Sequence, residues 1–154
     1  DAAADSGGAV VIMHMQGTPE MMQAAPSYGF APVEIYEFLE DRIEAALAAG
    51  IPRERIAVDP GFGFGKTVQH NLALVNFAAM FHGLGVPVLI GVSRKSSIAA
   101  MSSGEDSDNR LAGSLGLAMA TVVQGCQLLR VHDVAETRQA LAIQTALAGG
   151  ADAG

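Results

Sequence analysis

The chain has 154 residues, of which 50% are hydrophobic and 16% charged, a composition typical of globular proteins and not of disordered ones. The length suits one domain with a sizeable core. A formal net charge of −7 argues against nucleic acid as a partner, because proteins that bind polyanions carry a basic face. The only cysteine, Cys126, rules out a disulfide framework and is expected as a small core residue. No apolar run reaches the roughly 20 residues that span a bilayer, so no membrane is expected as a partner and the cytoplasm is the expected location.

Four short apolar runs predict strands that are buried on both faces, because their hydrophobicity is continuous and does not alternate. They occupy residues 9–15, 55–59, 86–92 and 127–132. Helical patterns follow them at 33–49, 71–82, 108–124 and 133–147. This β-α-β-α order predicts an α/β fold with a parallel sheet and right-handed crossovers, in one domain over 1–154. Residues 1–8 are expected to be the tail of a helix rather than the start of a protein, and residues 149–154 a disordered tail.

Polar side chains stand where each predicted strand ends. Asp59 closes the second strand, Ser93, Arg94 and Lys95 follow the third, and Arg130 and His132 end the fourth. The carboxyl ends of parallel strands share one edge of a sheet, which is where ligands bind in such folds. Arg94, Lys95, Arg130 and His132 therefore predict a basic cluster in an acidic protein, suited to a phosphate. Asp59 is either a turn residue or a functional carboxylate, and its basic neighbours favour function.

The glycine-rich segment at 59–66 is similar to a phosphate-binding loop of nucleotide hydrolases, but the spacing fails. Such a loop needs a glycine six residues before its lysine, Lys66, and Pro60 occupies that position. Glycines at alternate positions instead predict a loop that approaches a ligand closely, with Phe62 and Phe64 as apolar walls or core residues. We expect one of the two to be a core residue. His14 is interpreted as a packed or hydrogen-bonded side chain rather than a metal ligand.

Five segments resemble those of dihydropteroate synthases, in the order and at the spacing of that family. They are MHMQGTP at 13–19, DPGFGFGK at 59–66, GVSRKS at 91–96, RLAGS at 110–114 and RVHDV at 130–134. The resemblance implies a (β/α)8 TIM barrel, of which this chain would supply strands five to eight with their helices. It also implies the family reaction, in which 6-hydroxymethyl-7,8-dihydropterin diphosphate and p-aminobenzoate give 7,8-dihydropteroate and diphosphate.

The resemblance also assigns roles to individual residues. The implied pterin-binding residues are Asp59, Lys95, Met13 and Gly91. Arg130 and His132 would bind the diphosphate, and Lys95, Arg130 and His132 would be the catalytic groups. The implied p-aminobenzoate site consists of Ser93, Phe64 and Gly63, with Ser93 expected at a helix start that favours a carboxylate. Arg94 is expected to order a loop or to lie at the rim.

The resemblance further implies a magnesium cofactor and a homodimer. The family's first four strands, which carry the residue linked to the metal, have no counterpart in this sequence, so no metal ligand is assigned to it. Two other interpretations are kept. One is a pterin-binding methyltransferase domain, which has a similar barrel; the other is a non-catalytic half-barrel that only binds or assembles.

Overall fold

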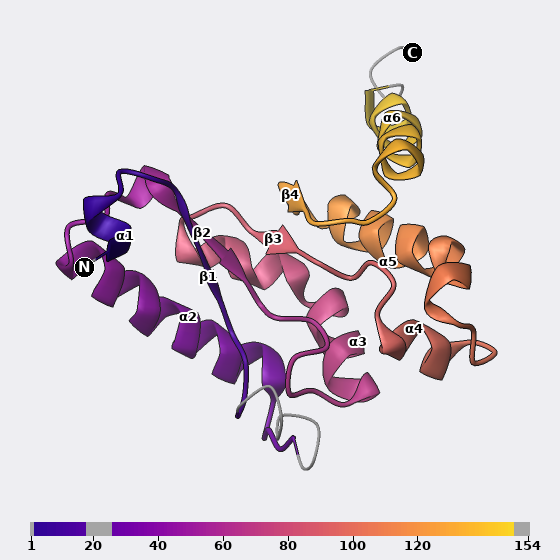
Figure 1. The fold of residues 1–154 in the computed structure, drawn as a ribbon, viewed down its shortest axis with the longest axis horizontal. Helices are drawn as coiled ribbons and strands as arrows, with labels where there is room; N and C mark the ends of the chain where they lie inside the picture. The colour runs from indigo at the N-terminus through magenta and orange to yellow at the C-terminus, as the bar shows by residue number, and fades with distance from the viewer. Residues whose placement is uncertain (1, 18–25, 150–154) are drawn as a thin grey trace.

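The computed structural model describes residues 2–17 and 26–149 of the chain. In chain order its elements are helix α1 (Ala2–Asp5), strand β1 (Val10–Met13), helix α2 (Ala31–Ala48), 3-10 helix η1 (Arg53–Arg55), strand β2 (Ile56–Asp59), helix α3 (Val68–Asn76), 3-10 helix η2 (Ala78–Leu84), strand β3 (Leu89–Ile90), helix α4 (Ser96–Met101), 3-10 helix η3 (Ser107–Asn109), helix α5 (Leu111–Val123), strand β4 (Leu128–Leu129) and helix α6 (Val134–Gly149) (Figure 1). The alternation of strand and helix confirms the predicted α/β class.

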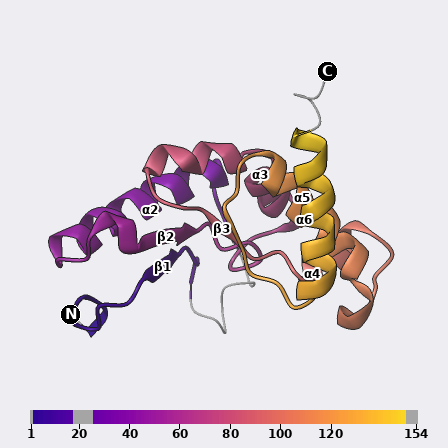
Figure 2. The same cartoon turned by 90° about the horizontal axis from the view of Figure 1, so that it is seen from above.

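The four strands run parallel and follow one another in chain order. Strand β1 pairs with β2 over four residues, with Met13 opposite Asp59, and β3 pairs with β4 over two. A single parallel bridge between Val58 and Val88 joins the two pairs. Because all four strands point the same way, their carboxyl ends meet at one edge. Figure 2 shows this succession of strands, with α2 and α6 near opposite ends of the molecule.

Several predicted boundaries were wrong. Strands β3 and β4 contain two residues each, although the Arg130 N–H still donates to the Ile90 carbonyl at 3.0 Å. The helix predicted over 71–82 is two elements, because the backbone at Phe77 (φ −111°, ψ 20°) leaves the α-helical region and η2 follows. Helix α3 begins three residues earlier than predicted, where Thr67 and His70 form a reciprocal capping box.

The two ends of the chain compare differently with expectation. A short helix, α1, lies within the first eight residues, as predicted. At the other end α6 includes Gly149, two residues beyond the predicted helix end. Residues 150–154 of the predicted disordered tail, and positions 18–19 of the first family-like segment, lie outside the described residues.

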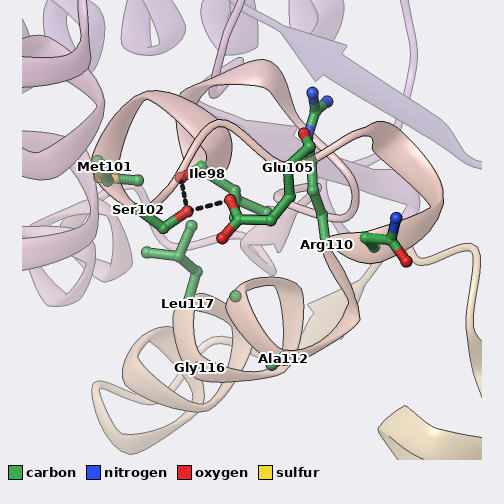
Figure 3. A pocket seen from close by; sticks show the side chains of 10 residues that line it. Ile98, Met101, Ser102, Glu105, Arg110, Ala112, Gly116 and Leu117 are labelled. Atoms are coloured by element: carbon green, nitrogen blue, oxygen red, sulfur yellow. Dashed lines mark hydrogen bonds between the residues drawn. The ribbon is translucent and has the colours of Figure 1, made fainter.

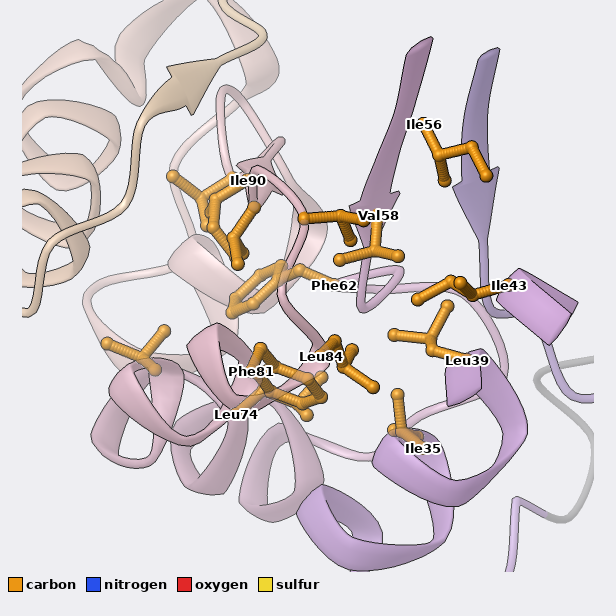
Figure 4. Close-up of a cluster of buried hydrophobic side chains, with 14 of the residues drawn as sticks. Ile35, Leu39, Ile43, Ile56, Val58, Phe62, Leu74, Phe81, Leu84 and Ile90 are labelled. Carbon is orange, nitrogen blue, oxygen red and sulfur yellow. The ribbon is translucent and has the colours of Figure 1, made fainter. Parts of the chain in front are cut away.

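The core lies between the sheet and helices α2, α3 and η2. Helix α2 contributes Ile35, Leu39 and Ile43, whose spacing of four residues places them on one face (Figure 4). They pack with β2, with Leu74 from α3 and with Phe81 and Leu84 from η2. Phe62 is 3% exposed and belongs to this core, whereas Phe64 is only half-buried. The expectation that one of the two phenylalanines is a core residue is thus confirmed, and so is the packing of the half-buried Cys126 against the core.

Burial decreases toward α6. Of its described residues only Thr137 is buried, while Ile143 and Leu147 are 61% and 68% exposed. The helix packs mainly on α5 and projects from the end of the molecule that carries β4 (Figure 1). None of the helices among residues 2–17 and 26–149 is long and apolar enough to cross a membrane.

Phe81→Ala is expected to lower the free energy of unfolding by about 3–5 kcal/mol, because it removes a fully buried aromatic side chain and leaves a cavity. Denaturant titration measures this loss. The matched control is Phe77→Ala, since Phe77 lies four residues earlier and is 46% exposed. Equal losses for the two variants would contradict the placement of the core.

Candidate functional site

The carboxylate of Asp59 is the centre of the predicted site. Asp59 is the last residue of β2 and is 2% exposed. The Gly61 N–H donates to its Oδ1 at 2.8 Å, and Arg130 Nη2 lies 3.5 Å from its Oδ2. Burial raises the pKa of Asp59, while the Gly61 hydrogen bond and the positive charges of Arg130, Lys95 and Lys66 act in the opposite direction. The structure therefore gathers three cations around one buried carboxyl group.

Met13 is the last residue of β1 and Gly91 directly follows β3, the strands on either side of β2. Met13 is the partner of Asp59 in the ladder, and the next residue, His14, donates its N–H to the Asp59 carbonyl at 3.0 Å. Gly91 follows β3 and is buried. A Cβ at Gly91 would lie 3.2 Å from Arg130 Nε, so a larger residue would crowd the guanidinium that reaches Asp59. Glycine at this position leaves room for the Arg130 side chain, which is otherwise 58% exposed.

Ser93 and His132 contact each other. The Ser93 hydroxyl accepts the His132 backbone N–H at 3.2 Å and lies 3.0 Å from His132 Nδ1. The prediction that Ser93 stands at a helix start was wrong, because α4 begins three residues later, at Ser96. Between them Arg94 adopts a left-handed backbone with φ 57°, which interrupts any helix that starts earlier.

Arg94 orders the loop and does not join the basic cluster. Its guanidinium forms two hydrogen bonds with the Asp133 carboxylate and a third with Asp108 Oδ1 at 3.1 Å. Its backbone N–H donates to the Ser114 hydroxyl at 2.9 Å. The expectation that Arg94 orders a loop is confirmed. The predicted phosphate-binding cluster therefore loses this member and keeps Lys95, Arg130 and His132.

Lys95 lies over the ring of Phe64. Its Nζ is 3.9 Å from the ring centroid, which is a cation–π contact. Burial lowers the pKa of Lys95, as does the charge of Arg130, while Asp59 raises it. A Cβ at Gly63 would lie 3.3 Å from Lys95 Cδ, so the glycine accommodates the lysine stem. Lys95 thus contacts the glycine-rich loop through Phe64 and interacts with Asp59 through its charge.

The glycine-rich loop, residues 61–66, lies directly on the segment that follows β1. Gly61 and Gly65 have φ values of 73° and 64°, and a Cβ on them would come within 1.8 Å of the His14 carbonyl oxygen and 2.5 Å of the Gln16 carbonyl oxygen. Neither position can hold another residue without displacing the backbone. The Tyr28 hydroxyl donates to the Gly65 carbonyl at 3.0 Å and fixes the far end of the loop.

Two buried residues that hold this loop were missed by sequence reasoning. Asn71 is fully buried; its Oδ1 accepts the Gly63 N–H at 2.8 Å and its Nδ2 donates to Ser97 Oγ at 2.9 Å. Lys66 is 3% exposed, and its Nζ donates to the Phe64 carbonyl at 2.9 Å and lies 2.9 Å from His14 Nδ1. A usable signal existed for Lys66, because it and Lys95 are the only two lysines in the sequence and both follow predicted strand ends.

Burial lowers the pKa values of both Lys66 and His14. Burial lowers the pKa of Lys66 to about 7, helped by the charge of Lys95 and opposed by Asp59. Burial and the charge of Lys66 lower the pKa of His14 to about 4. His14 is therefore neutral at neutral pH and its Nδ1 can accept from Lys66. The expectation of a packed, hydrogen-bonded histidine is confirmed, since the ring also meets Phe38 edge-on at 4.9 Å.

A hollow of about 280 Å³ opens beside the loop, between the start of α3 and the start of α4. Its lining includes Gly63, Lys66, Ser96 and Ser97. A larger cavity of about 420 Å³ lies between α4 and α5, lined mainly by Ile98, Met101, Leu117 and other apolar groups (Figure 3). None of the predicted site residues lines that larger cavity, so the chemistry of the strand ends is not located there. Among residues 2–17 and 26–149, no three His, Cys, Asp or Glu side chains lie close enough together to hold a metal ion.

Comparisons with known proteins find dihydropteroate synthases among the relatives of this chain. The chain is 43% identical over 143 residues to the dihydropteroate synthase of Escherichia coli, covering 93% of this chain and 50% of the relative. The dihydropteroate synthase of Yersinia pestis, solved with a sulfonamide drug complex, matches with a TM-score of 0.93 and 40% identity over 97% of this chain and 54% of that one. The enzyme of Xanthomonas albilineans, solved in complex with 7,8-dihydropteroate, matches with a TM-score of 0.88 and 42% identity over 95% of this chain and 53% of that one.

The chain therefore spans about half the length of the curated relatives that it matches. The family described as "pterin binding enzyme" matches residues 1–132, which include every strand end discussed above. The chain belongs to the family of pterin-binding enzymes.

Proposed function

We propose that this chain is the second half of a dihydropteroate synthase barrel and contributes to joining 6-hydroxymethyl-7,8-dihydropterin diphosphate with p-aminobenzoate. The observation that carries the proposal is the buried Asp59 carboxylate with Arg130, Lys95 and Lys66 around it. A carboxylate binds the adjacent amino and ring N–H groups of a pterin, and cations bind the diphosphate. The identity to dihydropteroate synthases and the solved complex with 7,8-dihydropteroate support this pairing of ligands.

The pterin is placed against Asp59. The carboxylate accepts from the 2-amino group and the ring N–H of the pterin, while Lys95 donates to the carbonyl side. Met13 and Gly91 flank Asp59 from the two neighbouring strands and line the slot. Because Asp59 is buried at the base of the slot, an N–H edge that meets it loses water and gains charged acceptors, which fixes the orientation of the ring.

Arg130 and His132 are placed against the diphosphate. In the reaction the bond between the pterin methylene carbon and the diphosphate oxygen breaks, and the electron pair leaves with the diphosphate. The amine nitrogen of p-aminobenzoate then donates its lone pair to the methylene carbon and loses a proton. Arg130, His132 and Lys95 stabilise the negative charge that develops on the leaving group, so no protein nucleophile is required.

The arylamine is placed on the other side of Lys95. Phe64 supplies an apolar wall beneath the Lys95 ammonium, Gly63 lines the adjacent hollow, and Ser93 lies behind them with its hydroxyl on His132. An aromatic ring that carries a carboxylate suits a site with an aromatic wall and a cation. The resemblance to a synthase solved with a sulfonamide drug supports an arylamine site in this family.

The proposed enzyme is a (β/α)8 barrel, and β1 to β4 correspond to its strands five to eight. The parallel order of the four strands and the half-length coverage of the relatives support this assignment. The proposal includes a cytoplasmic homodimer and a magnesium ion near the diphosphate, which neutralises charge when bound. Its ligands are assigned to the first half of the barrel.

The experiment that tests the function joins the first half of the Escherichia coli synthase to residues 1–154 and measures conversion of p-aminobenzoate into dihydropteroate. The joined protein is expected to form product, whereas the chain alone is expected to form none, because four strands cannot close an eight-stranded barrel. Size-exclusion chromatography of the chain alone accompanies the assay. An active monomer of residues 1–154, or a folded but inactive joined protein, would contradict the proposal.

Asp59→Asn in the joined protein is expected to weaken pterin binding by about 2–4 kcal/mol, because the amide presents a donor where the carboxylate presented an acceptor to buried N–H groups. Calorimetry with the pterin diphosphate measures the change. Asp41→Asn, on an exposed position of α2, serves as the matched control. Unchanged affinity in the Asp59 variant would remove Asp59 from the pterin site.

A further inference from the structure

Lys66 contributes its charge near Asp59 but has no substrate contact assigned to it in the proposed reaction, although it is one of the most deeply buried charged residues among those that the structure describes. Its side chain is surrounded by groups from three strand ends: His14 after β1, Asp59 at the end of β2 and Lys95 after β3. Burying a lysine is costly unless its amine is hydrogen-bonded, and the Lys66 amine lies 2.9 Å from both His14 Nδ1 and the Phe64 carbonyl oxygen. We expect a protein to retain a buried lysine, despite this desolvation cost, where its hydrogen bonds fix a required geometry.

The two bonds join the glycine-rich loop to the segment after β1. One end is the Phe64 carbonyl, within the loop, and the other is the His14 ring. The loop already touches the His14 and Gln16 carbonyls so closely that Gly61 and Gly65 tolerate no side chain. Steric contact alone resists compression but not separation. Lys66 supplies an attraction that keeps the loop seated.

The His14 end of this link is itself immobilised. Its ring meets Phe38 edge-on at 4.9 Å and lies 6.0 Å from the Tyr28 ring, so it is clamped between aromatic groups. Tyr28 also holds the Gly65 carbonyl. A fixed acceptor at one end means that the position of the Lys66 amine determines the position of the Phe64 carbonyl, and with it the ring beneath Lys95.

We propose that Lys66 is a positioning residue for the second substrate: it ties the glycine-rich loop to His14 and thereby holds Phe64 as the wall of the arylamine site. This inference rests on the proposed function. Lys66 acts through Phe64 and does not take part in the bond-making step. Its stem also lines the hollow beside Gly63, on the same side as the arylamine site. The effect of losing Lys66 falls mainly on p-aminobenzoate, because Lys66 is the weakest of the three charges that act on the pterin-binding carboxylate of Asp59.

The test compares Lys66→Met with Thr67→Ala in the joined protein described above. Methionine keeps the apolar stem and removes both bonds. Thr67→Ala is the matched control, because Thr67 is the adjacent residue and lines the same hollow but caps α3 with its side chain, so its loss destabilises the same region by another route. Hydrogen exchange measures the loop directly, and steady-state kinetics measure KM for each substrate.

Lys66→Met is expected to accelerate amide exchange in residues 61–66 and to raise KM for p-aminobenzoate by about 10-fold or more, the equivalent of one to two lost charge-assisted bonds. The KM for the pterin diphosphate is expected to change less than about twofold, and kcat to change little. Thr67→Ala is expected to leave both KM values near the wild-type values.

Unchanged exchange in residues 61–66 would overturn the link between Lys66 and the loop. Faster exchange with equal rises in both KM values, or the same KM shift in Thr67→Ala, would overturn the positioning of Phe64. If the wild-type joined protein makes no dihydropteroate, the proposed function fails on its own. Exchange then still decides whether Lys66 holds the loop.

Discussion

The burial of one carboxylate at the end of a parallel strand is the constraint on which the arrangement of this molecule depends. Asp59 cannot stay ionised in a site that excludes water unless donors and cations approach it. The Gly61 N–H and the Arg130 guanidinium do so directly, and Lys95 and Lys66 contribute their charges from nearby. These groups come from segments that follow three strands. They converge only because the strands are parallel and in register.

The convergence of these groups on Asp59 also requires glycine at several nearby positions. Three side chains cannot surround one carboxyl group unless the backbone between them takes little space. Gly61 and Gly65 let the loop lie on the segment after β1, and Gly91 lets Arg130 pass toward Asp59. Gly63 does the same for the stem of Lys95. The alternate glycines of this sequence are therefore explained by packing density around a charge, without a phosphate cradle.

The order of elements and the convergence of Asp59, Lys95 and Arg130 could be predicted from the sequence, because continuous apolar runs and the polar residues that end them are local signals. Other features were not local. Arg94 was assigned to a basic cluster, yet its partner Asp133 lies 39 residues away in sequence and removes that charge from the site. In the sequence Lys66 stood out only as part of a loop motif whose spacing fails. Its buried position depends on His14, which lies 52 residues away in the sequence.

The helix boundaries failed for a related reason. An apolar pattern continues through Phe77, but the backbone turns there so that Phe81 and Leu84 can enter the core, and tertiary packing overrides the local pattern. Ser93 was expected at a helix start as part of the p-aminobenzoate site that the family resemblance implies. The left-handed conformation of Arg94, held by Ser114 and Asp133, postpones the helix to Ser96.

The distribution of burial across the sheet bears on the proposed half-barrel. Val58 on β2 and Val88, which directly precedes β3, are fully buried, whereas Val11 on β1 is 50% exposed and Leu128 on β4 is 41% exposed. Among residues 2–17 and 26–149, the outer edges of β1 and β4 have no further strand beside them. Apolar strands with open edges are unstable toward association, which natural proteins avoid by pairing or covering them. In a closed barrel both edges would be paired, and the side chains of the outer strands would be as buried as those of the inner ones. The gradient from centre to edge is consistent with the half-barrel proposed above, in which β1 and β4 would each pair with a strand of the other half.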